Sequence, residues 1–105
     1  MKILITGCRG QLGTELQHQL AEEGCVLGPL PERLRKATVI PVDVDELDIT
    51  DREATINYIR HHQPDTVINC AAFTNVNGCE TSRDAAFGVN AIGPRNLALA
   101  CDKVN

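Results

Sequence analysis

The residues best suited to chemistry lie near the start of the chain, in the segment Thr6-Gly7-Cys8-Arg9-Gly10-Gln11-Leu12-Gly13. Its three glycines have the spacing Gly7-x-x-Gly10-x-x-Gly13. Glycine lets backbone N–H groups approach an anion without a Cβ in the way. A helix that begins here would add unpaired N–H groups and the positive end of its dipole. The segment therefore predicts a phosphate-binding turn.

The residues on either side predict the elements that hold this turn. The short apolar run Lys2-Ile3-Leu4-Ile5 indicates a strand buried on both faces. Leu12, Leu16 and Leu20 recur at every fourth position and predict a leucine stripe along an amphipathic helix. A strand, a glycine turn and a helix in this order are the context that a phosphate site requires. A strand–helix turn that binds nothing is the alternative.

Three further apolar runs, at residues 25–27, 38–42 and 66–70, predict additional strands, with helical patterns between them. Such alternation is typical of an α/β fold with right-handed crossovers. We therefore expect a Rossmann-like, doubly wound parallel sheet in three layers (αβα). The 105 residues would form one domain that ends before a fifth strand.

Two helices follow the acidic loop at residues 43–49. The first is predicted from Asp51 to about His62, with Thr50 and Glu53 as a capping box and Ile56 and Ile59 inward. Pro64 should end it. The last helix should begin near residues 81–82, with Ala85, Ala86, Val89, Leu97 and Cys101 inward. Pro94 should kink it, because proline lacks an N–H.

Composition excludes several classes of function. The net charge of −4 and the pI of about 5.2 argue against nucleic acid as a partner. No apolar run approaches the ~20 residues of a membrane span, and the N-terminal apolar run is too short for a signal peptide. We therefore expect a cytoplasmic protein. The five cysteines, an odd number without a C-x-x-C motif, indicate reduced structural thiols, and no metal site is predicted.

In an open parallel sheet, ligands bind at the carboxyl ends of the strands. A dinucleotide would place its pyrophosphate on Gly10, Gln11 and Leu12. Its adenine would lie near Asp48 and Ile49, with the carboxylate accepting from the exocyclic amine. The turn that follows the run at 66–70 would pass beneath the pyrophosphate and the nicotinamide ribose; its residues are Ala71, Ala72, Phe73 and Thr74.

The choice of cofactor depends on the residues near the adenosine ribose. An acidic residue usually binds its hydroxyls about 20 positions after the turn, but none stands directly after Leu27, and Glu32 is the nearest. Arg9 lies where a 2′-phosphate would sit. We therefore predict that NADPH binds at least as well as NADH. The basic residues around Glu32 either help to bind that phosphate or form a solvated loop face; they are Arg33, Arg35 and Lys36.

Four motifs together resemble the N-terminal part of the dTDP-4-dehydrorhamnose reductase family, which belongs to the extended short-chain dehydrogenases/reductases. They are Gly-Gln-Leu-Gly at residues 10–13, Leu-Asp-Ile-Thr-Asp at 47–51, Asn-Cys-Ala-Ala-Phe-Thr at 69–74 and Val-Asn-Ala at 89–91. The resemblance implies hydride transfer from NADPH or NADH to the C4 keto group of a dTDP-activated sugar. The product would be dTDP-L-rhamnose, for cell-surface polysaccharide.

The resemblance also assigns cofactor contacts by position. Asn90 resembles the helix asparagine that supports the sheet edge and the catalytic water path in the superfamily. Alternatively, its polar side chain forms hydrogen bonds with backbone groups at the kink beside Pro94. The turn and the resemblance together give this candidate cofactor-binding set: Gly7, Arg9, Gly10, Gln11, Leu12, Gly13, Asp48, Ile49, Ala71, Ala72, Phe73, Thr74 and Asn90.

The chain departs from the family's pattern because it has no Tyr-x-x-x-Lys pair: its one tyrosine, Tyr58, is followed by His62. In the family, that pair and the sugar-binding lobe follow the fifth strand. We therefore expect residues 1–105 to be an N-terminal NAD(P)-binding domain that has no catalytic residue and is inactive alone. The open sheet edge where the fifth strand belongs would favour association into homo-oligomers. The alternatives are a non-catalytic regulatory subunit, an interaction module, or a nucleotide-sugar epimerase or dehydratase, which typically has an acidic ribose ligand after the second strand.

Overall fold

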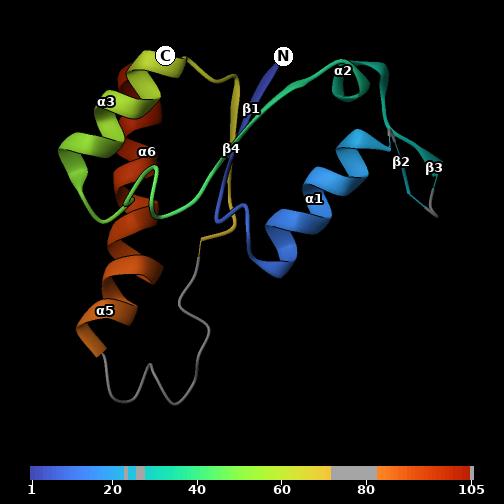
Figure 1. Ribbon diagram of the computed structural model, residues 1–105. Helices are drawn as coiled ribbons and strands as arrows, with labels where there is room; N and C mark the ends of the chain where they lie inside the picture. The colour runs from blue at the N-terminus through green and yellow to red at the C-terminus, as the bar shows by residue number, and fades with distance from the viewer. Residues whose placement is uncertain (23, 26–27, 72–82, 105) are drawn as a thin grey trace. The chain divides into compact units, whose positions relative to one another are not determined.

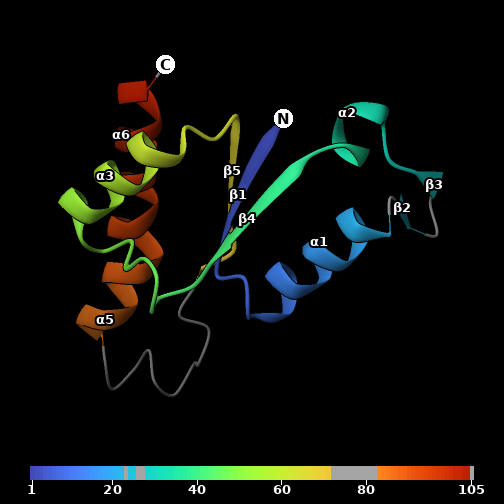
Figure 2. The same cartoon turned by 45° about the horizontal axis from the view of Figure 1, so that its top comes forward.

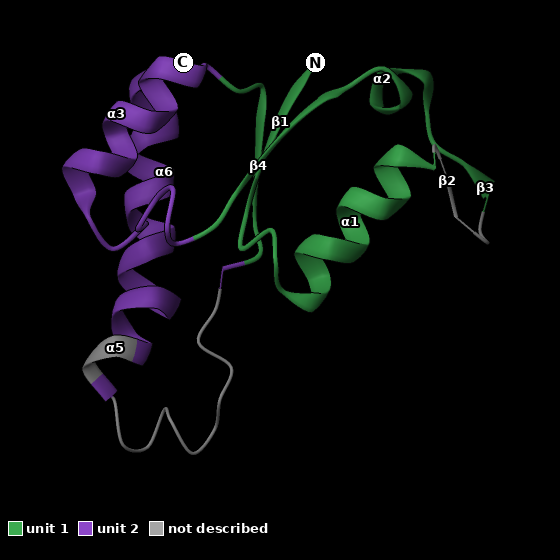
Figure 3. Cartoon of the chain, viewed as in Figure 1, with its two compact units in different colours: residues 1–43, 64–70 green, residues 44–63, 71–105 purple. Residues whose placement is uncertain are grey.

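The computed structural model describes residues 1–22, 24–25, 28–71 and 83–104 (Figure 1). They divide into two compact units, shown in Figure 3: a sheet unit of residues 1–43 and 64–70, and a helical unit of residues 44–63 and 71–105. The elements, in chain order, are β1 (Lys2–Thr6), α1 (Gln11–Ala21), β2 (Gly24–Cys25), β3 (Gly28–Pro29), α2 (Glu32–Arg35), β4 (Thr38–Val42), α3 (Arg52–His62), β5 (Thr66–Asn69), α5 (Arg83–Phe87), η1 (Gly88–Ile92) and α6 (Gly93–Val104).

The sheet unit is built on three parallel strands in the order β4-β1-β5 (Figure 2). The central strand β1 is buried, with Ile3, Leu4 and Ile5 at most 2% exposed, which confirms the prediction for this run. Thr6 at its end pairs in register with Val42 of β4 and with Asn69 of β5. Because the strands are parallel, the segments that follow all three meet at one edge, the carboxyl edge.

The strand expected at residues 25–27 does not join the parallel sheet in its described part. The two-residue strand β2 pairs antiparallel with β3 in a separate small sheet, and residues 26–27 lie outside the described part. Gly28, the first residue of β3, has a φ of 132°, which is open to glycine and strained for other residues. β4, and not β2, pairs with β1. Pro41 fits there because β4 is an outer strand, where a missing N–H is tolerated.

The leucine stripe predicted along α1 holds only in part. Leu16 and Leu20 are half-buried, whereas Leu12 is 62% exposed and Gly13 is the buried residue of this helix. Leu12 lies in the first turn of α1, directly after the glycine segment, so it faces solvent at the carboxyl edge instead of entering the core. No helix among the described residues combines the length and apolarity needed to cross a membrane.

In the helical unit, α3 and α6 lie side by side (Figures 1 and 2). Their buried apolar residues include the predicted Ile56, Ile59 and Leu97. The predicted capping box was wrong, because α3 begins one residue later and Asp51 is its N-cap. The Asp51 Oδ1 accepts from the Ala54 N–H at 3.1 Å.

The predicted distortion at Pro94 takes the form of a π-helical turn. Between α5 and α6, residues 88–92 form η1, and the Gly93 N–H donates to the carbonyl of Gly88 five residues earlier. Proline at position 94 has no N–H to continue the regular ladder, and a single wider turn absorbs the mismatch. The predicted start at residues 81–82 and the Ala85 side chain lie outside the described residues, and Ala86, Val89 and Cys101 are half-buried.

Candidate functional site

The glycine turn stands at the carboxyl edge, directly after the central strand. Gly7 has a φ of 63°, in the left-handed region that favours glycine. The Gly10 N–H donates to the Gly7 carbonyl at 3.1 Å and closes the turn. The Cys8 N–H donates to the carbonyl of Val42 at 3.1 Å, which ties the turn to the end of β4. The predicted position of this turn at the sheet edge is therefore confirmed.

The glycines at positions 13 and 10 have different surroundings. A Cβ on Gly13 would overlap the carbonyl oxygen of Gly7 and lie 2.9 Å from the Cα of Cys8, so α1 packs directly against the turn. A Cβ on Gly10 would meet the same oxygen at 3.4 Å, which the turn accommodates. Gly13 is therefore required for packing, whereas Gly10 keeps an open surface free of side chain.

Two side chains of α1 fix the underside of the turn. The Cys8 carbonyl accepts from Gln17 Nε2 at 2.8 Å and from Thr14 Oγ1 at 3.2 Å. Gly10, Gln11 and Leu12 are exposed, and no described side chain caps the start of α1. The first N–H groups of a helix have no partner within it. The turn therefore presents backbone donors to solvent, which is the arrangement that binds phosphate groups.

The acidic residue beside this turn is Asp43, which the sequence pattern did not single out. It follows β4, the strand next to β1. Its Oδ2 accepts from the Arg9 N–H at 3.0 Å and lies 3.7 Å from the Arg9 Nε. The acid was expected after Leu27, but β2 is not in the parallel sheet. The signal available in the sequence was the acid that directly follows the apolar run at 38–42.

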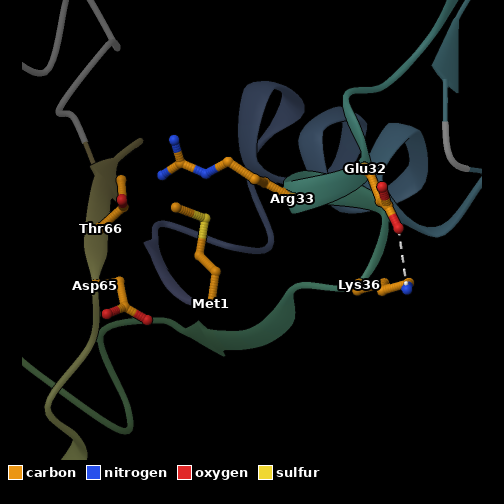
Figure 4. Close-up of a pocket in the computed structure, with 6 residues that line it drawn as sticks. All are labelled: Met1, Glu32, Arg33, Lys36, Asp65 and Thr66. Carbon is orange, nitrogen blue, oxygen red and sulfur yellow. Dashed lines mark ion pairs between the residues drawn. The ribbon is translucent and has the colours of Figure 1, made fainter.

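Of the two interpretations of the basic residues around Glu32, the structure favours the solvated face. Lys36 pairs with Glu32 at 3.2 Å, and α2 lies at the opposite, amino edge of the sheet. There, an open pocket of about 730 Å³ is formed with the residues that precede β1 and begin β5 (Figure 4). Arg35 is exposed on α2 as well. The residues lining this pocket are Met1, Glu32, Arg33, Lys36, Asp65 and Thr66.

This amino-edge pocket carries balanced charges. The side chain of Arg33 reaches from α2 across Met1 towards Thr66 in Figure 4. The carboxylate of Asp65 accepts from the Lys2 backbone N–H at 2.7 Å. Two cationic and two acidic side chains line the pocket, so it offers no net attraction for the phosphates of a dinucleotide.

The remaining predicted contacts belong to the helical unit. Asp48 is exposed, and its Oδ1 accepts from Thr50 N at 3.0 Å and from Thr50 Oγ1 at 2.6 Å. Ile49 is 5% exposed. Ala71 is half-buried and Asn90 is exposed in η1, whereas Ala72, Phe73 and Thr74 lie outside the described residues. The structure thus places Asp43 beside the glycine turn. The Asp48–Ile49 turn belongs to the helical unit.

Tyr58 is not suited to proton transfer at neutral pH. It is half-buried in α3 and stacks on the ring of His62, with 4.3 Å between ring centroids. Burial, and secondarily the charge of Glu46, raises the pKa of its phenol above the ordinary value. An effective general acid has a pKa near the working pH. Tyr58 therefore acts as a packing residue.

A parallel sheet whose central strand passes through a glycine turn into a helix defines the Rossmann-like class of α/β proteins. The family model described as the RmlD substrate binding domain matches residues 1–105. The chain belongs to this family. The dTDP-4-dehydrorhamnose reductase of Mycobacterium tuberculosis is 41% identical over 103 residues, which are 98% of this chain and 29% of that protein.

Two solved structures confirm the predicted Rossmann-like fold. A dTDP-4-dehydrorhamnose reductase from Clostridium acetobutylicum is 46% identical, with a TM-score of 0.85 over 99% of this chain and 33% of that chain. The dTDP-4-dehydrorhamnose reductase from Bacillus anthracis, crystallised in complex with NADP, is 35% identical, with a TM-score of 0.81 over 98% of this chain and 32% of that chain. The chain thus spans about a third of the length of these relatives.

Proposed function

We propose that this chain is the dinucleotide-binding part of a dTDP-4-dehydrorhamnose reductase. The observation that carries the proposal is the exposed start of α1, with no described side-chain cap, which stands on the glycine turn directly after the central strand. An open set of backbone donors at this edge suits a pyrophosphate. The relatives support the proposal, because three similar proteins carry this name and one of them binds NADP.

In this proposal the chain holds NADPH or NADH along the carboxyl edge of the strands. The glycine turn binds the pyrophosphate, with Gly7 and Gly13 shaping the turn and Gly10, Gln11 and Leu12 supplying the contact surface. Asp48 and Ile49 receive the adenine. The remaining proposed contacts, towards the nicotinamide half, are Ala71, Ala72, Phe73, Thr74 and Asn90.

Asp43 and Arg9 are the proposed residues for the adenosine ribose. The Asp43 carboxylate would accept from ribose hydroxyls, as an acid after the neighbouring strand does in other dinucleotide sites. The Arg9 guanidinium would pair with the 2′-phosphate of NADPH. Because these two side chains face each other, one site serves both cofactors. The affinity for NADPH is raised by the Arg9 charge, with which NADH forms no ion pair because it lacks the 2′-phosphate.

The reaction proposed for a protein that contains this chain is reduction of dTDP-4-dehydro-L-rhamnose to dTDP-L-rhamnose. When bound, the reduced cofactor supplies a hydride to the C4 keto carbon. Residues of this chain bind and orient the cofactor, and none of the described side chains is placed as the proton donor for the keto oxygen. We further propose a cytoplasmic enzyme that forms homo-oligomers and binds no nucleic acid or membrane.

The structure removes one argument that the sequence offered against a nucleotide-sugar epimerase or dehydratase. Such proteins typically carry an acidic ribose ligand after the second strand, and Asp43 occupies the equivalent place beside β1. The preference for a reductase therefore rests on the relatives, and the non-catalytic regulatory subunit stays an alternative because none of the described side chains is placed as a catalytic residue that would distinguish the two.

Titration of the 105-residue chain with NADPH and NADH tests the proposal. We expect saturable binding of both, with NADPH at least as tight. Arg9→Ala should weaken NADPH binding by about tenfold or more and leave NADH binding nearly unchanged, since a charge-assisted pair contributes about 1.5–3 kcal/mol.

Arg35→Ala is the matched control, because Arg35 lies on α2 at the amino edge and should not affect either cofactor. Failure of the unchanged chain to bind NADPH would refute the proposed function. A strong preference for NADH that Arg9→Ala does not alter would refute the role of Arg9 alone.

A further inference from the structure

The carbonyl of Ile49 lies in a buried hydrogen-bonding site in the helical unit. It accepts from the Asn96 Nδ2 at 2.9 Å. The Thr55 Oγ1 lies 3.4 Å from the same carbonyl, but its closer acceptor is the carbonyl of Asp51, at 2.8 Å. Asn96 is 2% exposed and Thr55 is fully buried. A buried amide is costly unless its hydrogen bonds are made. The side chain of Asn96 on α6 is therefore committed to the loop that precedes α3.

The side chain of Ile49 is held in place by the same helix. A Cβ at position 93 would lie 2.5 Å from the Ile49 Cδ1 and 2.7 Å from its Cγ1, so Gly93 leaves the space that Ile49 fills. The carbonyl and the side chain of Ile49 are thus both fixed against α6. One residue of the loop is immobilised at two points.

The neighbouring Asp48 is held by hydrogen bonds from the two residues that follow Ile49. Its carbonyl accepts from the Asp51 N–H at 3.0 Å, and its Oδ1 accepts from both the N–H and the hydroxyl of Thr50. The whole Asp48–Ile49 turn is therefore anchored on one side by α6 and on the other by its own hydrogen bonds. The exposed part of the turn is the Asp48 carboxylate.

We propose that Asn96 is a positioning residue for the adenine end of the dinucleotide, acting through the carbonyl of Ile49 on the direction of the Asp48 carboxylate. The inference rests on the proposed function. Asn96 is too deeply buried to touch a ligand. The exocyclic amine of adenine needs an acceptor at a set direction, and a pre-oriented carboxylate avoids the cost of ordering it on binding.

The test separates adenine binding from phosphate binding. ADP-ribose contains adenine, whereas inorganic pyrophosphate engages only the glycine turn, and both can be titrated into the 105-residue chain by NMR. Asn96→Leu removes the amide donor and keeps a side chain of similar size. We expect it to weaken ADP-ribose binding about three- to tenfold, the value of one hydrogen bond, and to leave pyrophosphate binding unchanged.

Leu99→Ala is the matched control, because Leu99 is half-buried on the same helix and makes no side-chain hydrogen bond. It should leave the affinity for both ligands unchanged. Equal weakening of both ligands by Asn96→Leu, or no change in either, would show that Asn96 is structural only and would overturn the inference. If the unchanged chain bound neither ligand, the proposed function would fail and this inference with it.

A ligand-free measurement tests the anchoring step separately. In Asn96→Leu, the amides of Thr50 and Asp51 should exchange with solvent faster, because both donate to Asp48, while the Ile59 amide in α3 keeps its protection. Unchanged exchange at both amides would overturn the inference. Should Asn96→Leu fail to fold, Asn96→Ala, which also removes the amide donor to Ile49 and adds no bulk, should show the same pattern in both experiments.

Discussion

Individual residues at the glycine turn show how the same amino acid serves different physical needs. Gly7 supplies a positive φ, Gly13 supplies space for the close approach of helix and turn, and Gly10 leaves a surface open. The sequence spacing alone treats the three as equivalent. Because their surroundings differ, we expect a substitution by alanine to change stability at one glycine and cofactor affinity at another.

Gly13→Ala should destabilise the chain, whereas Gly10→Ala should not. The added methyl at position 13 would overlap backbone atoms of Gly7 and Cys8, which cannot yield as a flexible side chain does. We expect a loss of about 1–3 kcal/mol in the free energy of unfolding, as for other overpacked sites. Urea denaturation of both variants measures this.

Gly10→Ala, the paired variant, should keep near-normal stability and lose NADPH affinity, since its methyl projects where the pyrophosphate is proposed to lie. If Gly13→Ala were as stable as the unchanged chain, the close packing of α1 on the turn would be disproved. If Gly10→Ala bound NADPH normally, the proposed phosphate contact at Gly10 would be wrong.

At the scale of elements, the start of α3 illustrates a competition between two capping residues. Thr50 and Asp51 are both good N-cap residues. In the structure the cap is Asp51, whose Oδ1 accepts from the Ala54 N–H at 3.1 Å, whereas the Thr50 hydroxyl donates to the Asp48 carboxylate at 2.6 Å and is held at the preceding turn. The existence of the helix and its end near Pro64 were predictable from local pattern. The choice of cap depended on a neighbouring turn.

Asp51→Ala should lower the free energy of unfolding by about 1 kcal/mol, because the Ala54 N–H loses its acceptor. Asp51→Asn retains an acceptor oxygen and should cost much less. Thermal or urea unfolding of the two variants provides the comparison. A larger loss from Thr50→Ala than from Asp51→Ala would mean that Thr50 is the cap after all.

At the scale of the whole molecule, burial of weakly acidic side chains links folding to pH. Burial raises the pKa of the Cys70 and Cys101 thiols above the ordinary value, and burial with the charge of Glu46 raises the pKa of Tyr58. The folded chain therefore keeps protons that the unfolded chain loses first. The stability that these groups contribute is complete at neutral pH and is lost as pH rises through the alkaline range.

We expect the free energy of unfolding to fall as pH is raised above about 8.5, the ordinary pKa of a thiol. Cys101→Ser removes one titrating group and should make this decline shallower. Urea denaturation of both proteins at neutral and alkaline pH, with a reducing agent present, checks the expectation. An equally steep decline in Cys101→Ser would exclude a contribution from the Cys101 thiol.

The sequence by itself determined what depends on near neighbours. The strand at residues 2–5, the glycine turn and the helix after it follow from the preferences and burial of adjacent residues, and so do the inward positions of Ile56 and Ile59 in α3. The four motifs likewise identified the family that residues 1–105 match. Short-range backbone sterics and hydrophobic periodicity are sufficient for such inferences.

Only the tertiary structure decided which segments lie beside one another. It placed β4 rather than β2 next to β1 and Asp43 beside Arg9, with Glu32 and its basic neighbours at the far edge of the sheet. It also directed Asn96 to the carbonyl of Ile49. Strand pairing and buried hydrogen bonds join residues distant in the chain, and their free energy depends on the packing of the whole unit, which no local pattern encodes.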